Sequence, residues 1–258
     1  MSAQGVWINE YGSLMTLAVD AGGSITGTYE STTGSTGKYV VIGHQQPADP
    51  TSAGGQALVL AIHWHSIQDG PPDASWHWSS GLSGQISVKE GAETMVLAHA
   101  LVVTEPFPGF APMGTYIDKL TYRRVSQEAG QSEAPHAAGS VSNPLAGRWR
   151  SADGTMLDIK VTPYGSGEFG WISGQISTGT VTAEIAGVTD IKAAHDGLTQ
   201  QSAAVTARLS SWGAVVSLSG SLNLTGRVLT MLDLSSAATA PNATYMQTTV
   251  STKTFAPL

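Results

Sequence analysis

The sequence predicts an all-β protein built from two antiparallel β-barrels in tandem. Short runs rich in Val, Ile, Thr, Leu and Trp alternate with clusters of Gly, Ser, Asp or Pro, and no run keeps a helical period. Thirty glycines and only 12% charged residues argue against long surface helices, coiled coils and charge-rich disorder. A length of 258 residues suggests two domains, since one domain usually takes roughly 100 to 200 residues.

The chain divides at a stretch that lacks core-forming side chains. Residues 127–143 contain one Val and no Leu, Ile or aromatic residue, so they cannot bury a core face and are predicted to form a flexible linker. The two predicted barrels are therefore residues 1–126 and 144–258.

A repeat supports this division. Trp7 and Gly12 in the first half are echoed by Trp149 and Gly154 in the second, at a constant offset of 142 residues. This offset indicates an internal duplication with divergence. Since both halves keep the Trp, we expect Trp7 and Trp149 to pack the barrel floor rather than to contact a ligand.

The first half contains about eight expected strands. Roughly eight strands in such a length suit a small closed barrel, because closure removes the sheet edges and leaves room for one small ligand. The clearest runs, in chain order, are Trp7 to Val19, Ser24 to Ser31, Lys38 to Gly43, Gln56 to His65, Ser75 to Val88, Thr94 to Thr104 and Thr115 to Val125.

Charge and composition exclude several classes of partner. With 12 basic and 19 acidic residues the net charge is −7, so no basic surface is expected for nucleic acid. The chain has no cysteine, which excludes disulfides, thiolate metal sites and cysteine nucleophiles. Apolar runs such as Ala57 to Ile62 are far shorter than the roughly 20 residues of a membrane helix. Met1 to Gly12 lacks the features of a secretory signal, and the compartment stays open.

The first expected strand carries an unusual polar face. Trp7, Asn9, Tyr11 and Ser13 are spaced by two, so all four are predicted to point to the same side of one strand. Buried Asn and Ser side chains need hydrogen-bond partners. Such a face is therefore atypical of a plain core.

A second expected strand adds to it. Tyr29 and Ser31, again two residues apart, contribute a phenol and a hydroxyl. If both faces line one barrel, five polar groups converge among aromatic rings, which is typical of a small-molecule pocket.

The residues of these two strands resemble a known family. Gly5 to Ser13 (GVWINEYGS) followed by Ile25 to Ser31 (ITGTYES) resembles the avidin and streptavidin family of biotin-binding proteins. The likeness continues in Gly55 to Ser66 and in Ser83-Gly84-Gln85, and covers most of residues 5–125. It implies an eight-stranded up-and-down barrel that holds biotin as a ligand, with no cofactor. Family members assemble as barrel pairs and tetramers, so two barrels in one chain could replace a homodimer, and further homo-oligomers are expected. A secreted protein would fit the resemblance.

The resemblance also implies roles for individual residues. Asn9, Ser13 and Tyr29 would donate hydrogen bonds to the ureido oxygen of biotin, and Ser31 would accept from a ureido N–H. Trp64 and Ser80 would lie on the hydrophobic side, and the loop with Gly34 and Ser35 would close over the carboxylate tail. The complete set of predicted ligand-binding residues is Asn9, Tyr11, Ser13, Tyr29, Ser31, Gly34, Ser35, Trp64, Ser80 and Leu82.

Departures from the family pattern predict a weakened site. Leu82 stands where the family has a Trp, and the Trp expected around Ala98 to Val102 is absent. Pro112 stands near the position of the Trp that the family lends to a neighbouring subunit, and Leu120 replaces the Asp or Asn that accepts the second ureido N–H. Each lost aromatic wall costs about 1 to 3 kcal/mol of apolar contact, and an unpaired N–H costs about 1 to 3 kcal/mol more. Reduced affinity is therefore expected.

The second half keeps less of the pattern. Ser151 and Asp153 stand at the ligand-facing positions, Ile176 replaces Tyr29, Leu209 replaces Trp64 and Lys253 takes the acidic or amide position. We expect a barrel here without a biotin site.

Other interpretations remain open at this stage. The polar set could be inherited without binding biotin, the pocket could take another ligand such as a carbohydrate or a peptide, or the barrels could be purely structural. His63 and His65 flank Trp64 and should face away from the pocket, toward solvent or the partner barrel, and no metal site is expected. No catalytic arrangement stands out, so an enzyme is not expected.

Overall fold

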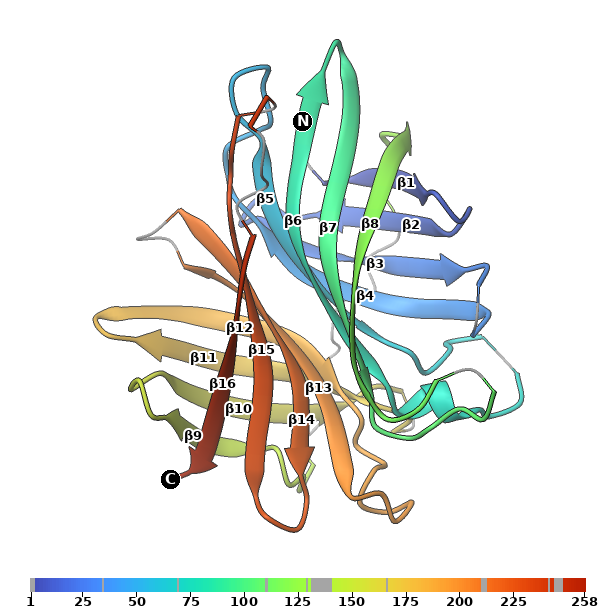
Figure 1. Cartoon of the computed structure of the whole chain (residues 1–258), viewed down its shortest axis with the longest axis vertical. Coiled ribbons are helices and arrows are strands. Elements are labelled where there is room, and N and C mark those ends of the chain that lie inside the picture. The colour runs from blue at the N-terminus through green and yellow to red at the C-terminus, as the bar shows by residue number, and fades with distance from the viewer. Residues whose placement is uncertain are drawn as a thin grey trace.

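The computed structural model describes residues 3–33, 35–68, 70–109, 111–128, 130, 141–165, 167–209, 213–240, 242–243 and 248–258. It forms two closed antiparallel barrels of eight strands each (Figure 1), which confirms the predicted fold class. In each barrel the strands follow chain order and the last strand pairs back with the first. Within the described residues, no helix is long and apolar enough to span a membrane.

The strands of the first barrel are joined in sequence by hairpins. A short 3-10 helix, η1 (Ala74–His77), precedes the sixth strand. The strands are β1 (Gly5–Asn9), β2 (Leu14–Val19), β3 (Ser24–Ser31), β4 (Gly37–Gln45), β5 (Gln56–His63), β6 (Ser79–Lys89), β7 (Ala92–Val103) and β8 (Gly114–Ser126).

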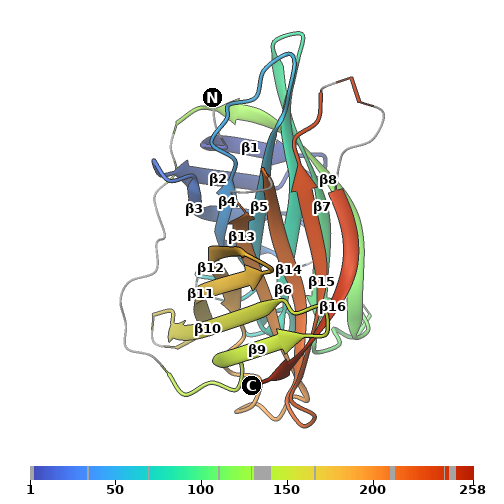
Figure 2. The same ribbon diagram turned by 90° about the vertical axis from the view of Figure 1, so that its left-hand side faces the viewer.

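The second barrel repeats this topology. In Figure 2 its strands β9 to β12 lie below β1 to β3, while the longer strands β6, β7, β14 and β15 run along the molecule. Its strands are β9 (Gly147–Ser151), β10 (Met156–Pro163), β11 (Gly170–Thr178), β12 (Val181–Thr189), β13 (Gln200–Leu209), β14 (Ala214–Asn223), β15 (Val228–Ala237) and β16 (Thr248–Pro257).

The prediction of one continuous strand through Trp7 and Ser13 is wrong. β1 ends at Asn9 and the chain turns before β2. The Asn9 side-chain oxygen accepts hydrogen bonds from the backbone N–H groups of Tyr11 at 3.0 Å and Ser13 at 2.9 Å, and Gly12 adopts a φ of 87°. An Asn that binds the backbone two residues on favours a turn over an extended strand.

The two barrels are equivalent residue by residue at their first hairpins. The indole N–H groups of Trp7 and Trp149 each donate to the carbonyl four residues earlier, both at 2.8 Å. Gly12 and Gly154 have φ values of 87° and 86°, and both Trp side chains are fully buried. The duplication and the packing role of the two Trp residues are thus confirmed.

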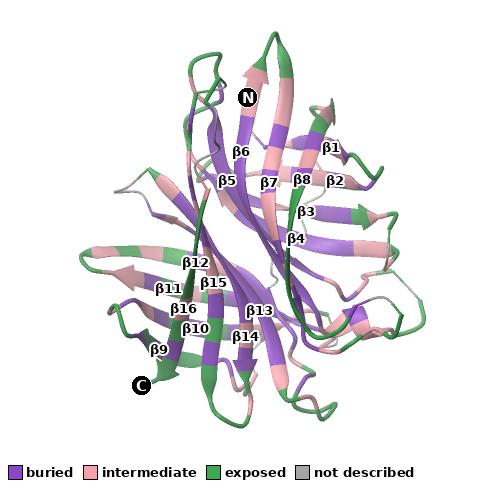
Figure 3. Cartoon of the chain, viewed as in Figure 1, coloured by how far each residue is buried: buried purple, intermediate pink, exposed green. Residues whose placement is uncertain are grey.

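The barrels pack through β5 and β6 against β13, β14 and β15. Of these strands, β5, β6, β13 and β14 are largely buried (Figure 3). Gly81 N–H donates to the Ser219 hydroxyl at 3.0 Å, and the hydroxyls of Ser83 and Ser236 are 2.7 Å apart. A Cβ at Gly81 would lie 2.4 Å from the Ser217 hydroxyl. The glycine therefore permits this close approach of the two sheets.

His63 and His65 lie at this interface. The His63 ring stacks on Phe169 of the second barrel with centroids 4.8 Å apart, and His65 packs on Trp76 at 3.8 Å. Both histidines are buried, and burial lowers the pKa of His63 well below its usual value. The expectation that they face away from the pocket, toward the partner barrel, is confirmed.

Most of the predicted linker, namely residue 129 and residues 131–140, lies outside the described residues, and the linker stays a prediction. The described parts that flank it are tied to the barrels. Gly130 N–H donates to the Leu17 carbonyl at 3.2 Å, and Val141 N–H donates to the Val161 carbonyl at 3.3 Å.

Candidate functional site: a cavity in the first barrel

The first barrel contains a cavity of about 330 Å³, a volume that suits a small organic ligand. Its walls come from the end of β1, from β3 and the following loop, and from β5 to β8. The lining residues are Asn9, Tyr11, Tyr29, Ser31, Thr33, Ser35, Ile62, Trp64, Trp78, Leu82, His99, Leu101, Asp118, Leu120 and Tyr122.

Strand β8 defines the depth of the cavity. Asp118, Leu120 and Tyr122 alternate along it and all three line the cavity, because residues two apart share a face. Tyr122 is fully buried, Leu120 is 7% exposed and Asp118 is exposed. Tyr122 pairs across the strands with Asn9 on β1, and Asp118 pairs with His99 on β7. The deep end is therefore at Tyr122 and Asn9, and the mouth is on the side of Asp118.

The deep end carries hydrogen-bond donors. The Asn9 amide NH₂ donates to the Tyr29 hydroxyl at 3.2 Å, while the Asn9 oxygen is held by the β1–β2 turn. Burial raises the pKa of Tyr29, so its phenol stays protonated near neutral pH. This arrangement presents an amide and a phenol to a ligand that brings an acceptor.

Ser13 lies behind these two residues rather than on the cavity wall. It is fully buried, and its hydroxyl contacts the Thr32 hydroxyl and accepts from the Thr32 N–H, both at 3.2 Å. It also lies close enough to Tyr29 to oppose the rise in the pKa of Tyr29. Of the three donors expected to converge on one oxygen, Asn9 and Tyr29 reach the cavity directly and Ser13 supports them.

Tyr122 is a deep polar residue that the sequence analysis missed. Its side chain is fully buried, and among the described residues its hydroxyl makes no well-formed hydrogen bond, although Tyr29 and Asn9 lie close enough to influence its pKa. Burial, with the neighbouring Tyr29, raises the pKa of Tyr122 well above its usual value. Its spacing of two from Leu120 was the sequence signal that placed it on the same inner face.

An aromatic wall stands beside the deep end. Trp64, just after β5, packs against Tyr39 at 4.9 Å and Tyr29 at 5.7 Å between ring centroids. Its indole N–H donates to the Ser80 hydroxyl at 2.8 Å. Ser80 is fully buried and is not among the cavity-lining residues, so it orients Trp64. Leu82 lines the wall as expected.

His99 occupies the inner face of β7 where a Trp was expected. Its Nε2 lies 2.8 Å from the Ser80 hydroxyl, so Ser80 connects His99 to Trp64. Burial lowers the pKa of His99 to about 4, although the Asp118 carboxylate opposes this. His99 is therefore neutral at pH 7.

The mouth is formed by Tyr11, Ser31, Thr33 and Ser35. The Ser31 hydroxyl donates to the Thr33 carbonyl at 2.8 Å, and the Ser35 hydroxyl contacts Tyr39 at 2.8 Å. Tyr11 is 54% exposed. The Ser31 hydroxyl is thus engaged by its own loop, whereas the Ser35 hydroxyl is engaged by Tyr39 on β4 and by Ser75 in η1, at 2.7 Å from the Ser75 hydroxyl. Gly34, which was predicted to belong to this loop site, lies outside the described residues.

The equivalent end of the second barrel is filled differently. Asp153 accepts from Ser151 and forms an ion pair with Lys253, and these contacts hold the pKa of Asp153 well below its usual range. Ile176 and Leu209 are 3% and 5% exposed and belong to the core. An ion pair and aliphatic side chains therefore occupy the positions of the Asn9, Tyr29 and Trp64 set.

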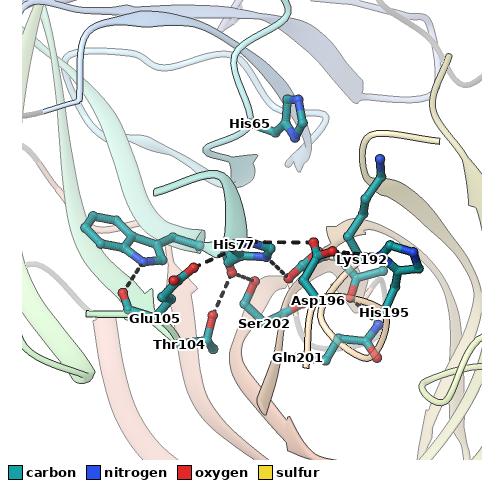
Figure 4. Close-up of polar contacts among 12 residues, drawn as sticks. His65, His77, Thr104, Glu105, Lys192, His195, Asp196, Gln201 and Ser202 are labelled. Carbon is teal, nitrogen blue, oxygen red and sulfur yellow. Dashed lines mark hydrogen bonds and ion pairs between the residues drawn. The ribbon is translucent and has the colours of Figure 1, made fainter. Parts of the chain in front are cut away.

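A separate polar cluster joins the barrels around His77 (Figure 4). The His77 Nδ1 lies 2.7 Å from Asp190 of the second barrel, and its Nε2 lies 3.4 Å from Glu105 and 3.9 Å from Asp196. Burial opposes protonation, but these carboxylates outweigh it and raise the pKa of His77. Among the described residues no group of three or more His, Asp or Glu is arranged to hold a metal ion.

The first barrel thus combines a closed eight-stranded fold with an internal cavity of a size that suits a small ligand. Residues 1–105 match the model of the Avidin family. The first barrel is therefore similar to the Avidin family, as its sequence resemblance indicated, and it is followed in the same chain by a second closed eight-stranded barrel.

Proposed function

We propose that the first barrel is a non-enzymatic receptor for biotin or a biotin-like ligand, and that the second barrel is its structural partner. The observation that carries this proposal is the cavity that begins at Asn9 and Tyr29 and passes Trp64 toward an open mouth. Two neutral donors at a closed end suit a ureido-type carbonyl oxygen, and the match to the Avidin family supports this ligand class.

The affinity should be lower than that of a family member with a complete site. Leu82 and Leu120 line the cavity, and neither can supply an indole wall or accept an N–H. Each missing aromatic wall and each unpaired N–H weakens binding by about 1 to 3 kcal/mol.

Isothermal titration with biotin tests the proposal. We expect one biotin per chain, and Asn9→Ala and Tyr29→Phe should each weaken binding by about 1 to 3 kcal/mol, because each removes one donor to a buried acceptor. The matched controls are Ser151→Ala and Ile176→Val in the second barrel, which should leave binding unchanged.

A gain-of-function variant sharpens the test. Leu120→Asp supplies a carboxylate at a cavity position that is 7% exposed, and should tighten biotin binding by accepting the second ureido N–H. If neither the natural chain nor Leu120→Asp gives heat with high micromolar biotin, the proposal fails. A different ligand, or inherited polarity alone, would then explain the cavity.

A further inference from the structure

The cavity wall carries a single formal charge, and that charge is negative. Of the lining residues described above, Asp118 is the one carboxylate, and neither Lys nor Arg is among them. The deep end is polar but neutral. Charge is therefore confined to the outer part of the wall.

Asp118 lies where the outward end of a bound ligand would pass. Asp118 and Tyr122 are four residues apart on one face of β8, which places their Cα atoms about 13 Å apart at roughly 3.3 Å per residue. A ligand anchored at Asn9 and Tyr29 that extends toward the mouth would run along this face. Asp118 also borders an adjoining hollow of about 240 Å³, shared with His99 and Tyr116.

Nothing described around Asp118 neutralises it. Its carboxylate accepts a hydrogen bond from the Lys119 backbone N–H at 2.7 Å, and within the described residues it forms no ion pair. The Lys119 side chain belongs to the opposite face of β8. His99, directly across from Asp118, is neutral because burial lowers the pKa of His99 to about 4.

A second carboxylate adds to the negative potential. Glu10, which accepts from the Thr121 N–H at 2.9 Å, contributes to raising the pKa values of Tyr29 and Tyr122. Its charge is therefore felt at the deep end of the same cavity.

Building on the function proposed above, we propose that the cavity prefers ligands whose outward end is an uncharged amide or a cationic amine over ligands that end in a free carboxylate. Asp118 would repel a carboxylate a few ångströms away and attract an ammonium group. Selectivity would thus come from a repulsive element at the mouth rather than from the deep contacts.

Titration calorimetry can compare three probes, namely biotin, its primary amide and its aminoethyl amide. The amide should bind about threefold to tenfold more tightly than biotin at low ionic strength, since two charges about 4 Å apart in a watery site interact by about 1 kcal/mol. The amine should bind more tightly still, because it exchanges a repulsion for an attraction. Added salt should reduce this difference. Asp118→Asn should strengthen binding of biotin itself and remove most of the preference.

The matched control is Asp158→Asn on β10 of the second barrel, an exposed strand carboxylate whose loss should not change the preference. Equal affinities for the three probes, tighter binding of biotin, or a preference that survives Asp118→Asn would each overturn the inference and leave the proposed function standing. If none of the probes binds, the proposed function itself fails, and this inference with it.

Discussion

At the scale of single residues, Tyr122 distinguishes this cavity from the one expected from the sequence. A buried hydroxyl without a partner costs about 1 to 3 kcal/mol, and such groups are rare in folded proteins. The Tyr122 hydroxyl makes no well-formed hydrogen bond among the described residues and its side chain lines the cavity. A bound ligand with a polar group at the deep end would remove this cost.

Replacing Tyr122 by Phe should therefore change stability and binding in opposite directions. Removal of the unpaired hydroxyl should leave the free energy of unfolding unchanged or raise it by about 1 kcal/mol, and ligand binding should weaken by about 1 to 3 kcal/mol. Urea unfolding and calorimetry would measure the two effects.

Tyr39→Phe is the matched control, because the Tyr39 hydroxyl contacts Ser35 at 2.8 Å and Tyr39 does not line the cavity. It should lower stability by about 1 kcal/mol and leave binding nearly unchanged. Unaltered binding in Tyr122→Phe would show that the ligand does not use this hydroxyl.

Several site residues could be placed from the sequence because the period of two assigns strand faces. Tyr29 and Ser31 share the inner face of β3, and Trp64 and Leu82 line the cavity as the resemblance implied. Ser13 and Ser80 could not be placed, because Thr32 and Trp64 compete for their hydroxyls. Such competition depends on side chains that are distant in sequence, which neither spacing nor family pattern reveals.

At the scale of elements, one serine connects three strands of the first barrel. Ser80 on β6 accepts from Trp64, at the end of β5, and contacts His99 on β7. The aromatic wall and the outer wall of the cavity are thereby held in a fixed relation. Their geometry depends on a residue that a ligand does not touch.

Ser80→Ala should lower the free energy of unfolding by about 1 to 3 kcal/mol, since it leaves a buried indole N–H and a buried imidazole without a partner. Ser79→Ala is the control, because among the described residues the buried Ser79 hydroxyl has no partner and its loss should cost little. Chemical denaturation followed by tryptophan fluorescence would separate the two. Equal effects would refute the connecting role of Ser80.

The strand pattern was largely predictable, and its exceptions have local causes. The run Ser24 to Ser31 coincides with β3, because turn residues bound it on both sides. The run from Trp7 to Val19 splits into two strands, since the Asn9 side chain closes a turn at Gly12. Periodicity alone cannot detect this turn, because the alternation continues through it.

At the scale of the whole molecule, buried histidines make stability depend on pH. Burial lowers the pKa values of His44, His65 and His99 to about 4 and holds the pKa of His63 well below its usual value, whereas unfolded histidines titrate near 6.5. Below pH 6.5 these histidines therefore bind protons in the unfolded chain but stay neutral in the folded chain. This difference favours unfolding. His77 acts in the opposite sense: its raised pKa contributes stability below pH 6.5 that is lost as the pH rises through the folded value.

We expect the free energy of unfolding to fall between pH 6.5 and about pH 4, because the four histidines with a lowered pKa outweigh His77, whose pKa is raised. By about pH 4, each histidine with a lowered pKa reduces the free energy of unfolding by up to about 3 kcal/mol. Urea titrations at pH 7.5, 6 and 5 would measure the decline. A constant urea midpoint over this range would contradict the expected protonation states.

The interface histidines should affect the packing between the two barrels without affecting ligand binding. His63→Ala combined with His65→Ala should weaken the packing between the barrels, because both rings contact Phe169, and should leave ligand affinity unchanged. In calorimetric unfolding, this loss would appear as a lower transition temperature or as two separate transitions. His195→Ala is the control, since that side chain is 85% exposed. A loss of ligand binding in the double variant would count against this assignment.

The contact between His77 and Asp190 illustrates an advantage of joining the two barrels in one chain. In a dimer of identical subunits, a residue on the two-fold axis meets its own copy, so the interface must be complementary to itself. Here the two faces have different sequences, and a base on one can meet an acid on the other. Each barrel is thus specialised for a partner that is synthesised with it in a one-to-one ratio, and their pairing does not depend on protein concentration.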